Sequence, residues 1–138
     1  MNECIFCEIV ADRSHADVVY RDAHVVAFLD RAPLFKGHVL VVPAMHVGTL
    51  LDMAPAALGE YFAVVQRVAA AVQRALDAHG SFVAINNVVS QSVPHLHVHV
   101  VPRRRKDGLR GFFWPRVRYA DAAESHATAA RIREFLAP

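Results

Sequence analysis

The sequence has few of the features that assign a chain to a class at once. Only two cysteines, Cys4 and Cys7, occur in 138 residues, which excludes the disulfide framework of a small secreted protein. The apolar runs are much shorter than the roughly 20 residues that a transmembrane helix needs. The first residues also lack the basic and apolar regions of a signal peptide. We therefore expect a cytoplasmic protein that does not associate with membranes.

Glycine-rich phosphate-binding motifs are missing as well. The six glycines form neither G-x-G-x-x-G nor G-x-x-x-x-G-K, so neither a Rossmann nor a P-loop site is indicated. A net charge of +2 is too small to indicate a nucleic-acid partner. Hydrophobic residues, in contrast, make up 54% of the chain. That content is enough to build the core of one domain.

The apolar pattern predicts an α+β domain. Short apolar runs predict strands at residues 18–21, 25–29, 38–42, 81–86 and 96–101. Helical spacing predicts a long helix over 55–79 that stops at Gly80. A second helix is expected over 122–136, capped by Asp121. This order of elements is typical of an antiparallel sheet covered by a helix.

Three histidines alternate with apolar residues in the last predicted strand. On a strand, His95, His97 and His99 share one face, and the apolar residues between them point into the core. Such a cluster serves either of two chemistries. The three histidines can bind one catalytic metal, or one of them can be a nucleophile that its neighbours orient.

This strand resembles the signature of the histidine-triad family, H-φ-H-φ-H-φ-φ, where φ is apolar. Further segments resemble the family in the same order: Cys4-Ile5-Phe6-Cys7, Phe28-Leu29-Asp30, Gly37 to His46, Asn86-Asn87, Gln91-Ser92-Val93 and Pro102-Arg103. Trp114-Pro115 is similar to a Trp-Pro pair of the family's Hint branch. The resemblance implies a single domain over 1–138 with a five-stranded antiparallel sheet, one long helix and a C-terminal helix. The basic loop and the C-terminal helix would begin at about residue 103.

The resemblance also implies an activity, that of a nucleotide hydrolase or transferase. His97 would attack the α-phosphorus of a nucleoside phosphoramidate or a dinucleoside polyphosphate. A covalent nucleotidyl-histidine would form, and water would then release the mononucleotide. His99 would lie at the phosphate, His38 would complete the site, and Ser92 would lie near the leaving group. A backbone carbonyl of the same strand is the expected partner for the other ring nitrogen of His97.

The same resemblance assigns residues to a purine nucleotide. Asp30 would hold the ribose hydroxyls, Phe28 would line the base pocket, and Asn86 and Gln91 would be polar neighbours of the nucleotide. The loop between the paired asparagines and Gln91 is shorter than is usual in the family. Ser90 stands where relatives usually carry a glycine, which tolerates positive φ.

The two cysteines are open to three interpretations by spacing alone: half a zinc site, free thiols or a redox pair. A tetrahedral zinc site needs two more ligands, and the resemblance supplies His46 and His95. We expect a structural zinc and assign His95 to it, although alternation places His95 on the same face as His97.

Two alternatives to this function are a metal-dependent hydrolase that uses the three triad histidines as ligands and a nucleotide-binding module without catalysis.

The resemblance further implies a homodimer in which two sheets join into one. The long helix offers an apolar face for that contact, at Tyr61, Phe62, Val65, Val68 and Val72. The basic stretch over 103–118 has two interpretations. It is either a solvated loop or a segment whose side chains, Arg104 and Arg105 among them, contact the outer phosphates of a dinucleoside polyphosphate.

Overall fold

The computed structural model describes residues 4–109 and 116–136. These residues belong to two compact units, Met1–Asp107 and Gly108–Pro138. The Trp114-Pro115 pair lies outside the described residues. The predicted single domain over 1–138 stays a prediction.

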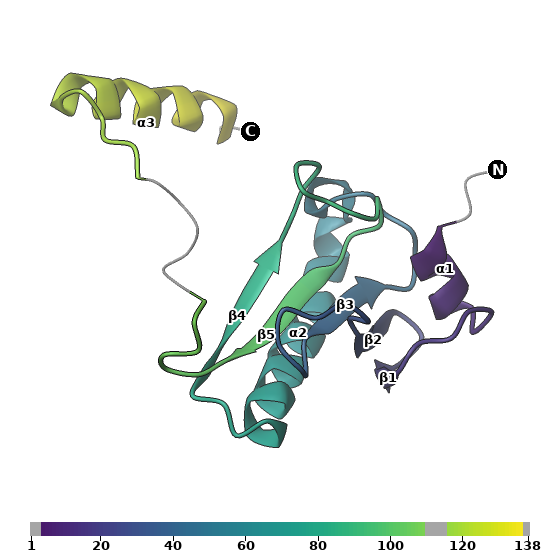
Figure 1. Cartoon of the computed structure of the whole chain (residues 1–138). Coiled ribbons are helices and arrows are strands. Elements are labelled where there is room, and N and C mark those ends of the chain that lie inside the picture. Colours follow the sequence, from purple (N-terminus) through teal and green to yellow (C-terminus); the bar gives the residue numbers. More distant parts are fainter. Residues whose placement is uncertain (1–3, 110–115, 137–138) are drawn as a thin grey trace. The chain divides into compact units, whose positions relative to one another are not determined.

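Five strands form one antiparallel sheet, as the sequence predicts (Figure 1). They are β1 (Val18–Arg21), β2 (Val25–Leu29), β3 (Val39–Pro43), β4 (Gly80–Ile85) and β5 (Val98–Arg103). Their order in the sheet is β1-β2-β3-β5-β4, so β3 is the middle strand and β5 lies between it and the edge strand β4. β5 begins two residues later than predicted, because the Leu96 N–H donates to the Val47 carbonyl and not to a neighbouring strand (2.8 Å).

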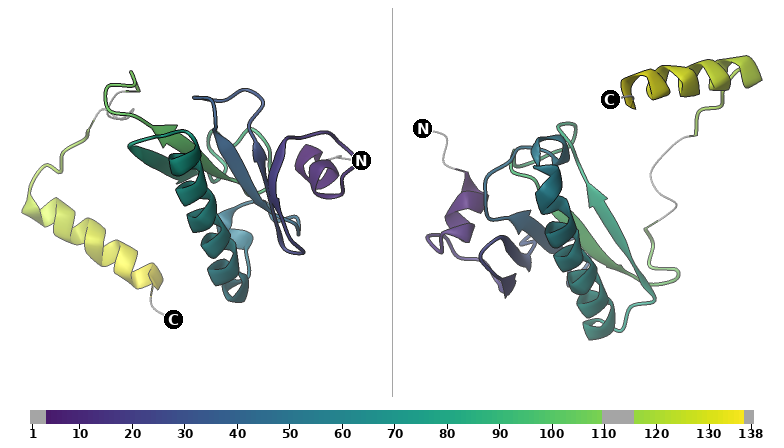
Figure 2. Two further views of the ribbon diagram at one scale, coloured as in Figure 1. Left: turned by 90° about the horizontal axis from the view of Figure 1, so that it is seen from below. Right: turned by 180° about the vertical axis from the view of Figure 1, so that it is seen from behind.

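The long helix α2 (Pro55–Ala75) lies along one face of the sheet (Figures 1 and 2). Its buried side chains form the main core with alternate residues of the strands, among them Val39, Val98 and Val100. Leu96 belongs to the same core. The apolar residues between the three histidines therefore face α2, as predicted, and the histidines of the strand face the other way.

A short helix that the sequence analysis missed, α1 (Ile5–Val10), packs on the other face. Phe6 and Ile9 join a second apolar cluster there with residues of β2 and β3, including Phe28 and Leu40. Cys4 is its N-cap. The Arg21 guanidinium closes its C-terminal end by donating to the Val10 carbonyl (2.7 Å). Six residues are too few to give a readable helical period.

The end of α2 differs from the prediction. The helix stops at Ala75, four residues early, and Gly80 is the first residue of β4 and not the stop. The turn uses Asp77 in the left-handed region (φ 51°). Arg104 caps this end: its guanidinium donates to the carbonyls of Leu76 and Asp77.

The second unit contains the predicted C-terminal helix, α3 (Ala122–Leu136). Asp121 is its N-cap, as predicted, because its Oδ1 accepts the Glu124 N–H (2.8 Å). A 3₁₀ turn, η1 (Leu50–Asp52), precedes α2 in the first unit. Within the described residues, no helix combines the length and apolarity that crossing a membrane requires.

Candidate active site

A cavity of about 600 Å³ lies on the sheet face opposite α2. The central strands supply its floor and α1 supplies one wall. The lining residues are Ile5, Phe6, Ile9, Ser14, His15, Ala16, Asp17, Phe28, Leu29, Asp30, Arg31, Leu40, Ser92, Val93, His97 and His99. A largely apolar hollow with a few convergent polar groups is the usual form of a small-molecule site.

His97 is held in one tautomer at the floor of this cavity. The residue is 3% exposed, and its Nδ1–H donates to the backbone carbonyl of His95 (2.8 Å). When the ring is neutral, Nε2 therefore carries the lone pair. This is the backbone partner that the sequence analysis expected. Phe6 packs edge-on against the ring, with centroids 5.1 Å apart and an interplanar angle of 84°.

His38 and His99 form a relay whose tautomers follow from the backbone. The Leu34 N–H donates to Nδ1 of His38 (3.1 Å), so in the neutral ring the proton is on Nε2. That Nε2–H donates to Nδ1 of His99 (3.0 Å), which leaves the proton of His99 on its own Nε2. Among the described residues, Nε2 of His99 is the buried side-chain atom that lacks a hydrogen-bond partner. His99 thus offers one N–H donor beside His97, whose ring centroid is 4.9 Å away.

Burial keeps both relay histidines neutral. It lowers the pKa of His38 from its ordinary 6.5, and the positive charge that His97 can carry lowers it further, against the nearby Asp30 carboxylate. It lowers the pKa of His99 to about 4, with the same help from His97 and His38. The relay therefore holds its protons in the order described at neutral pH.

Three of the other predicted residues line the cavity. Phe28 is buried at the end of β2, next to Phe6 (centroids 5.4 Å apart). Asp30 follows this strand, and its Oδ1 accepts the Ala32 N–H (2.9 Å). Its Oδ2 lies 3.7 Å from Nδ1 of His38. Ser92 is exposed, lies in the loop before β5 and also lines the cavity.

Two predicted nucleotide-binding residues do not line this cavity. The Gln91 side chain is used locally: its Nε2 donates to the Gly48 carbonyl (2.6 Å) and its Oε1 accepts the Val88 N–H (3.1 Å). Asn86 is half-buried at the end of β4, outside the lining. Their nucleotide-binding role stays a prediction. Ser90 adopts φ 64°, the conformation for which a glycine at this position is suited.

The sequence analysis missed the wall made by α1 and residues 14–17. Ile5, Phe6 and Ile9 lie on one side of α1 and face the cavity. The apolar spacing i, i+1, i+4 within the cysteine segment is the one signal that could have indicated this wall.

The predicted metal ligands come together at the N-terminal end of α1. The donor atoms of Cys4, Cys7, His46 and His95 all lie within 4.8 Å of one another. Nδ1 of His95 is 3.4 Å from Sγ of Cys4, and Nδ1 of His46 is 3.2 Å from Sγ of Cys7. The Nε2 of His95 lies 2.9 Å from the Pro43 carbonyl, which is the outer partner that orients a metal-binding imidazole. Two thiolates and two imidazoles suit tetrahedral zinc.

This arrangement separates the three triad histidines. His95 turns its Nδ1 towards the cysteines, whereas His97 and His99 face the cavity. The other cluster of metal-type donors in the described residues is Asp30, His38 and His99, and it lacks both His95 and His97. One metal held by all three triad histidines is therefore not compatible with the geometry.

Two arginines at the end of β5, Arg103 and Arg104, make contacts outside the cavity. Arg103 forms a two-pronged ion pair with Asp107 (2.6 and 2.9 Å), and Arg104 caps α2. Arg103 is four residues beyond His99 on the same strand, or roughly 13 Å at strand spacing. Arg104 thus has a structural role, and neither residue lines the cavity.

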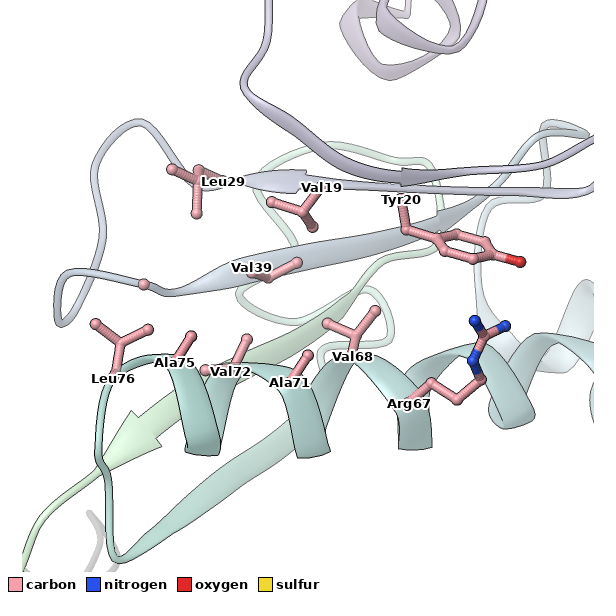
Figure 3. Close-up of a pocket in the computed structure, with 11 residues that line it drawn as sticks. Val19, Tyr20, Leu29, Val39, Arg67, Val68, Ala71, Val72, Ala75 and Leu76 are labelled. Carbon is pink, nitrogen blue, oxygen red and sulfur yellow. The ribbon is translucent and has the colours of Figure 1, made fainter.

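A second hollow lies between α2 and the strands β1 to β3 (Figure 3). Its volume is about 340 Å³. Valine, alanine and leucine side chains line most of it, and Arg67 stacks over the Tyr20 ring at one end (5.2 Å). No histidine lines this hollow, whereas His97 and His99 line the larger cavity.

Comparison with known proteins gives a family match for this chain. The family model described as the HIT domain matches residues 12–106. A protein named Protein hit from Bacillus subtilis is 36% identical over 113 residues, which are 80% of this chain and 78% of that protein. An adenylylsulfatase from Arabidopsis thaliana is 30% identical over 78% of this chain and 56% of its own length. An asymmetrical bis(5'-nucleosyl)-tetraphosphatase from Schizosaccharomyces pombe is 36% identical over 67% of this chain and 52% of its own length.

Solved structures agree with the fold. A HIT family protein from Bacillus subtilis has a TM-score of 0.87 at 32% identity, and the match covers 99% of both chains. A zinc-bound histidine triad family protein from Mycobacterium smegmatis has a TM-score of 0.73 at 35% identity, with 95% of this chain and 96% of that one covered.

Proposed function

The chain belongs to the HIT domain family, and from that premise we propose that it hydrolyses a nucleotide at the α-phosphate through a covalent nucleotidyl-His97 intermediate. The observation that carries this proposal is the pairing of two ring nitrogens in the cavity. His97 offers the Nε2 lone pair of a nucleophile, because its Nδ1–H is fixed on the His95 carbonyl. His99 offers the Nε2–H donor that a phosphoryl oxygen needs.

In the first step, Nε2 of His97 attacks the α-phosphorus. A P–N bond forms and the bond to the leaving group breaks, so the ring of His97 becomes cationic. The His95 carbonyl stabilises that cation through the Nδ1–H. The Nε2–H of His99 donates to a non-bridging oxygen as charge develops there. Ser92, which lines the cavity, would assist the leaving group.

In the second step, water attacks the same phosphorus. The P–N bond breaks, the mononucleotide leaves, and His97 recovers its neutral ring. Both steps need the nucleoside held in place, because positioning can contribute of order 7–11 kcal/mol in ideal cases. Asp30 would accept from the ribose hydroxyls, and Phe28 with the α1 wall would enclose a purine base.

We consider three chemical classes of substrate, which differ in their leaving group. A nucleoside phosphoramidate and a dinucleoside polyphosphate are the two classes expected from the sequence. Relatives named as an adenylylsulfatase and as a bis(5'-nucleosyl)-tetraphosphatase add adenylyl sulfate and support the polyphosphate. All three share an adenylyl group with the scissile bond at its α-phosphorus.

A zinc ion would be held by Cys4, Cys7, His46 and His95, with a structural role. Four protein ligands close the coordination sphere, so the ion would contribute folding energy and leave no position for substrate. A zinc-bound relative supports this assignment. Elemental analysis of protein purified without chelators should give one zinc per chain, and a zinc-free, folded protein would contradict it.

A substrate panel tests the proposed function. We expect AMP release from at least one of adenosine phosphoramidate, adenylyl sulfate and diadenosine tetraphosphate. The variant His97→Ala should lose more than about a thousandfold in kcat, equivalent to ~4 kcal/mol of barrier. His126→Ala, on the exposed side of α3, is the matched control and should keep wild-type turnover. AMP binding without turnover of any substrate would favour the non-catalytic nucleotide-binding module.

A further inference from the structure

We propose that Cys4 and Cys7 are an oxidation site that controls the nucleotide cavity. A peroxide would oxidise the two thiolates to a disulfide. Cys4 and Cys7 could then no longer hold zinc, and the α1 wall beside His97 would lose its anchor. The inference rests on the proposed function for the identity of the nucleotide ligand, and it adds a modification site to that function.

The two thiols are placed for this chemistry. Cys4 is the N-cap of α1, and its Sγ accepts the Cys7 N–H (3.4 Å). The two sulfurs lie within 4.8 Å of each other, and both residues are only half-buried. A peroxide can therefore reach either sulfur, and the second sulfur is close enough to complete a disulfide.

His95 links the site to the nucleophile from one side. Its Nδ1 faces the sulfurs of Cys4 and Cys7 at 3.4 and 3.6 Å. Its carbonyl accepts the Nδ1–H of His97 (2.8 Å). The residue that would bind the metal is thus the residue that fixes the tautomer of His97.

Phe6 links the site to the cavity from the other side. It lies between the two cysteines in sequence and contacts His97, Phe28 and His95, with ring centroids 5.1, 5.4 and 5.9 Å away. All three contacts are edge-on. Movement of the first turn of α1 therefore moves a side chain that touches both the nucleophile and the predicted base pocket.

The other anchors of the helix lie on its inner side and towards its C-terminal end. The helix contains six residues, too few for a helix that is stable alone in water. Phe6 and Ile9 hold its inner side, and the Arg21 guanidinium holds its C-terminal end. At the N-terminal end, the anchors are the cysteines themselves. A disulfide, which needs the sulfurs about 2.05 Å apart, replaces the metal and the Cys7 N–H bond to Cys4.

The reaction is a two-electron oxidation. One thiolate attacks a peroxide oxygen, the O–O bond breaks, and a sulfenic acid and hydroxide form. The second thiolate attacks the sulfenic sulfur, the S–S bond forms and hydroxide leaves. Two protons from the buffer convert the two hydroxides to two waters. A zinc ion held at this site would lose both of its thiolate ligands.

The experiment uses the full chain with zinc bound. Protein is treated with one equivalent of hydrogen peroxide, zinc release is followed with a chromophoric chelator, and the disulfide is detected by intact mass. The dissociation constant for AMP is measured calorimetrically before and after. We expect one zinc released per chain, a Cys4–Cys7 disulfide, and a rise in Kd of about tenfold, which is ~1.4 kcal/mol. Dithiothreitol with zinc should restore the original Kd.

Two controls isolate the cysteines. Methionine sulfoxide is not reversed by dithiothreitol, so recovery excludes oxidation of the exposed Met45. The variant Cys7→Ser cannot form the disulfide, and its AMP affinity should not respond to peroxide. If that variant fails to fold, the wild-type protein still tests the proposal, because its Kd for AMP is measured before oxidation, after oxidation and after reduction.

Hydrogen exchange separates this proposal from the proposed function. Exchange should accelerate at the amides of residues 5–10 and 95–99 after oxidation, with or without nucleotide. If the reduced protein binds no AMP, the proposed function fails. In that case, hydrogen exchange alone tests whether oxidation of the cysteines affects the α1 wall and the segment around His97. A disulfide with zinc release but no change in exchange and Kd would overturn the proposal, as would the absence of a disulfide.

Discussion

At the scale of single residues, the arrangement of protons decides what the histidines do. The Leu34 N–H fixes the tautomer of His38, and His38 fixes that of His99. The His95 carbonyl does the same for His97. The motif identifies these residues in the sequence, and the strand predicts the carbonyl partner. The role of Leu34 could not be predicted, because it depends on a turn outside the motif.

The pH dependence of stability tests the buried relay. Burial lowers the pKa of His99 from 6.5 to about 4, so between these values the unfolded chain binds a proton that the folded chain does not. The contribution of His99 to the free energy of unfolding is complete above pH 6.5 and is lost as the pH falls towards 4. We expect urea denaturation to show that the free energy of unfolding falls less between about pH 7.5 and about pH 5 in His99→Asn than in wild type. Equal losses would show that His99 does not titrate in this way.

At the scale of elements, long repeating patterns could be predicted and short ones could not. The five strands and the two longer helices follow from period-two and period-3.6 apolar spacing. α1 was missed because six residues hold less than two turns. The stop of α2 was misplaced because a distant arginine, Arg104, and a left-handed Asp77 end the helix where no glycine stands.

The contact of Arg104 with the end of α2 predicts how its removal affects both the stability of the fold and the KM values for substrates. Arg104→Ser should lower the free energy of unfolding by ~1 kcal/mol, because the carbonyls of Leu76 and Asp77 lose a charged donor. The ratio of KM values for diadenosine tetraphosphate and adenosine phosphoramidate should not change. Arg105→Ser, which removes an exposed neighbouring charge, is the matched control for net charge. A several-fold rise in KM for the tetraphosphate alone would restore a phosphate-binding role.

At the scale of the whole molecule, the predicted homodimer needs a contact surface other than the apolar face of the long helix. The sequence analysis gave it the apolar face of the long helix, but the chain's own core buries four of the five residues, Tyr61, Val65, Val68 and Val72. Phe62 remains 37% exposed. β4 is an edge strand of the sheet with Val83 43% exposed, and an edge offers backbone groups to a second copy.

Light scattering tests the dimer. We predict a solution mass of twice 15.2 kDa at micromolar concentration. Val83→Pro should shift the protein towards monomer, because proline removes a backbone donor from the edge strand. Val19→Pro in β1, at the other edge of the sheet, is the control and should leave the mass unchanged. A wild-type mass near 15.2 kDa would refute the dimer.

The central claim is that His97 becomes covalently nucleotidylated, and trapping the intermediate tests it most directly. Wild-type protein is mixed with excess substrate and quenched within the first turnover in alkaline denaturant, since acid cleaves a P–N bond to histidine. Intact mass and peptide sequencing then locate any adduct. The account predicts one adenylyl group per site on His97 in wild type and none in His97→Ala. Turnover with no adduct, or an adduct on another residue, would contradict it.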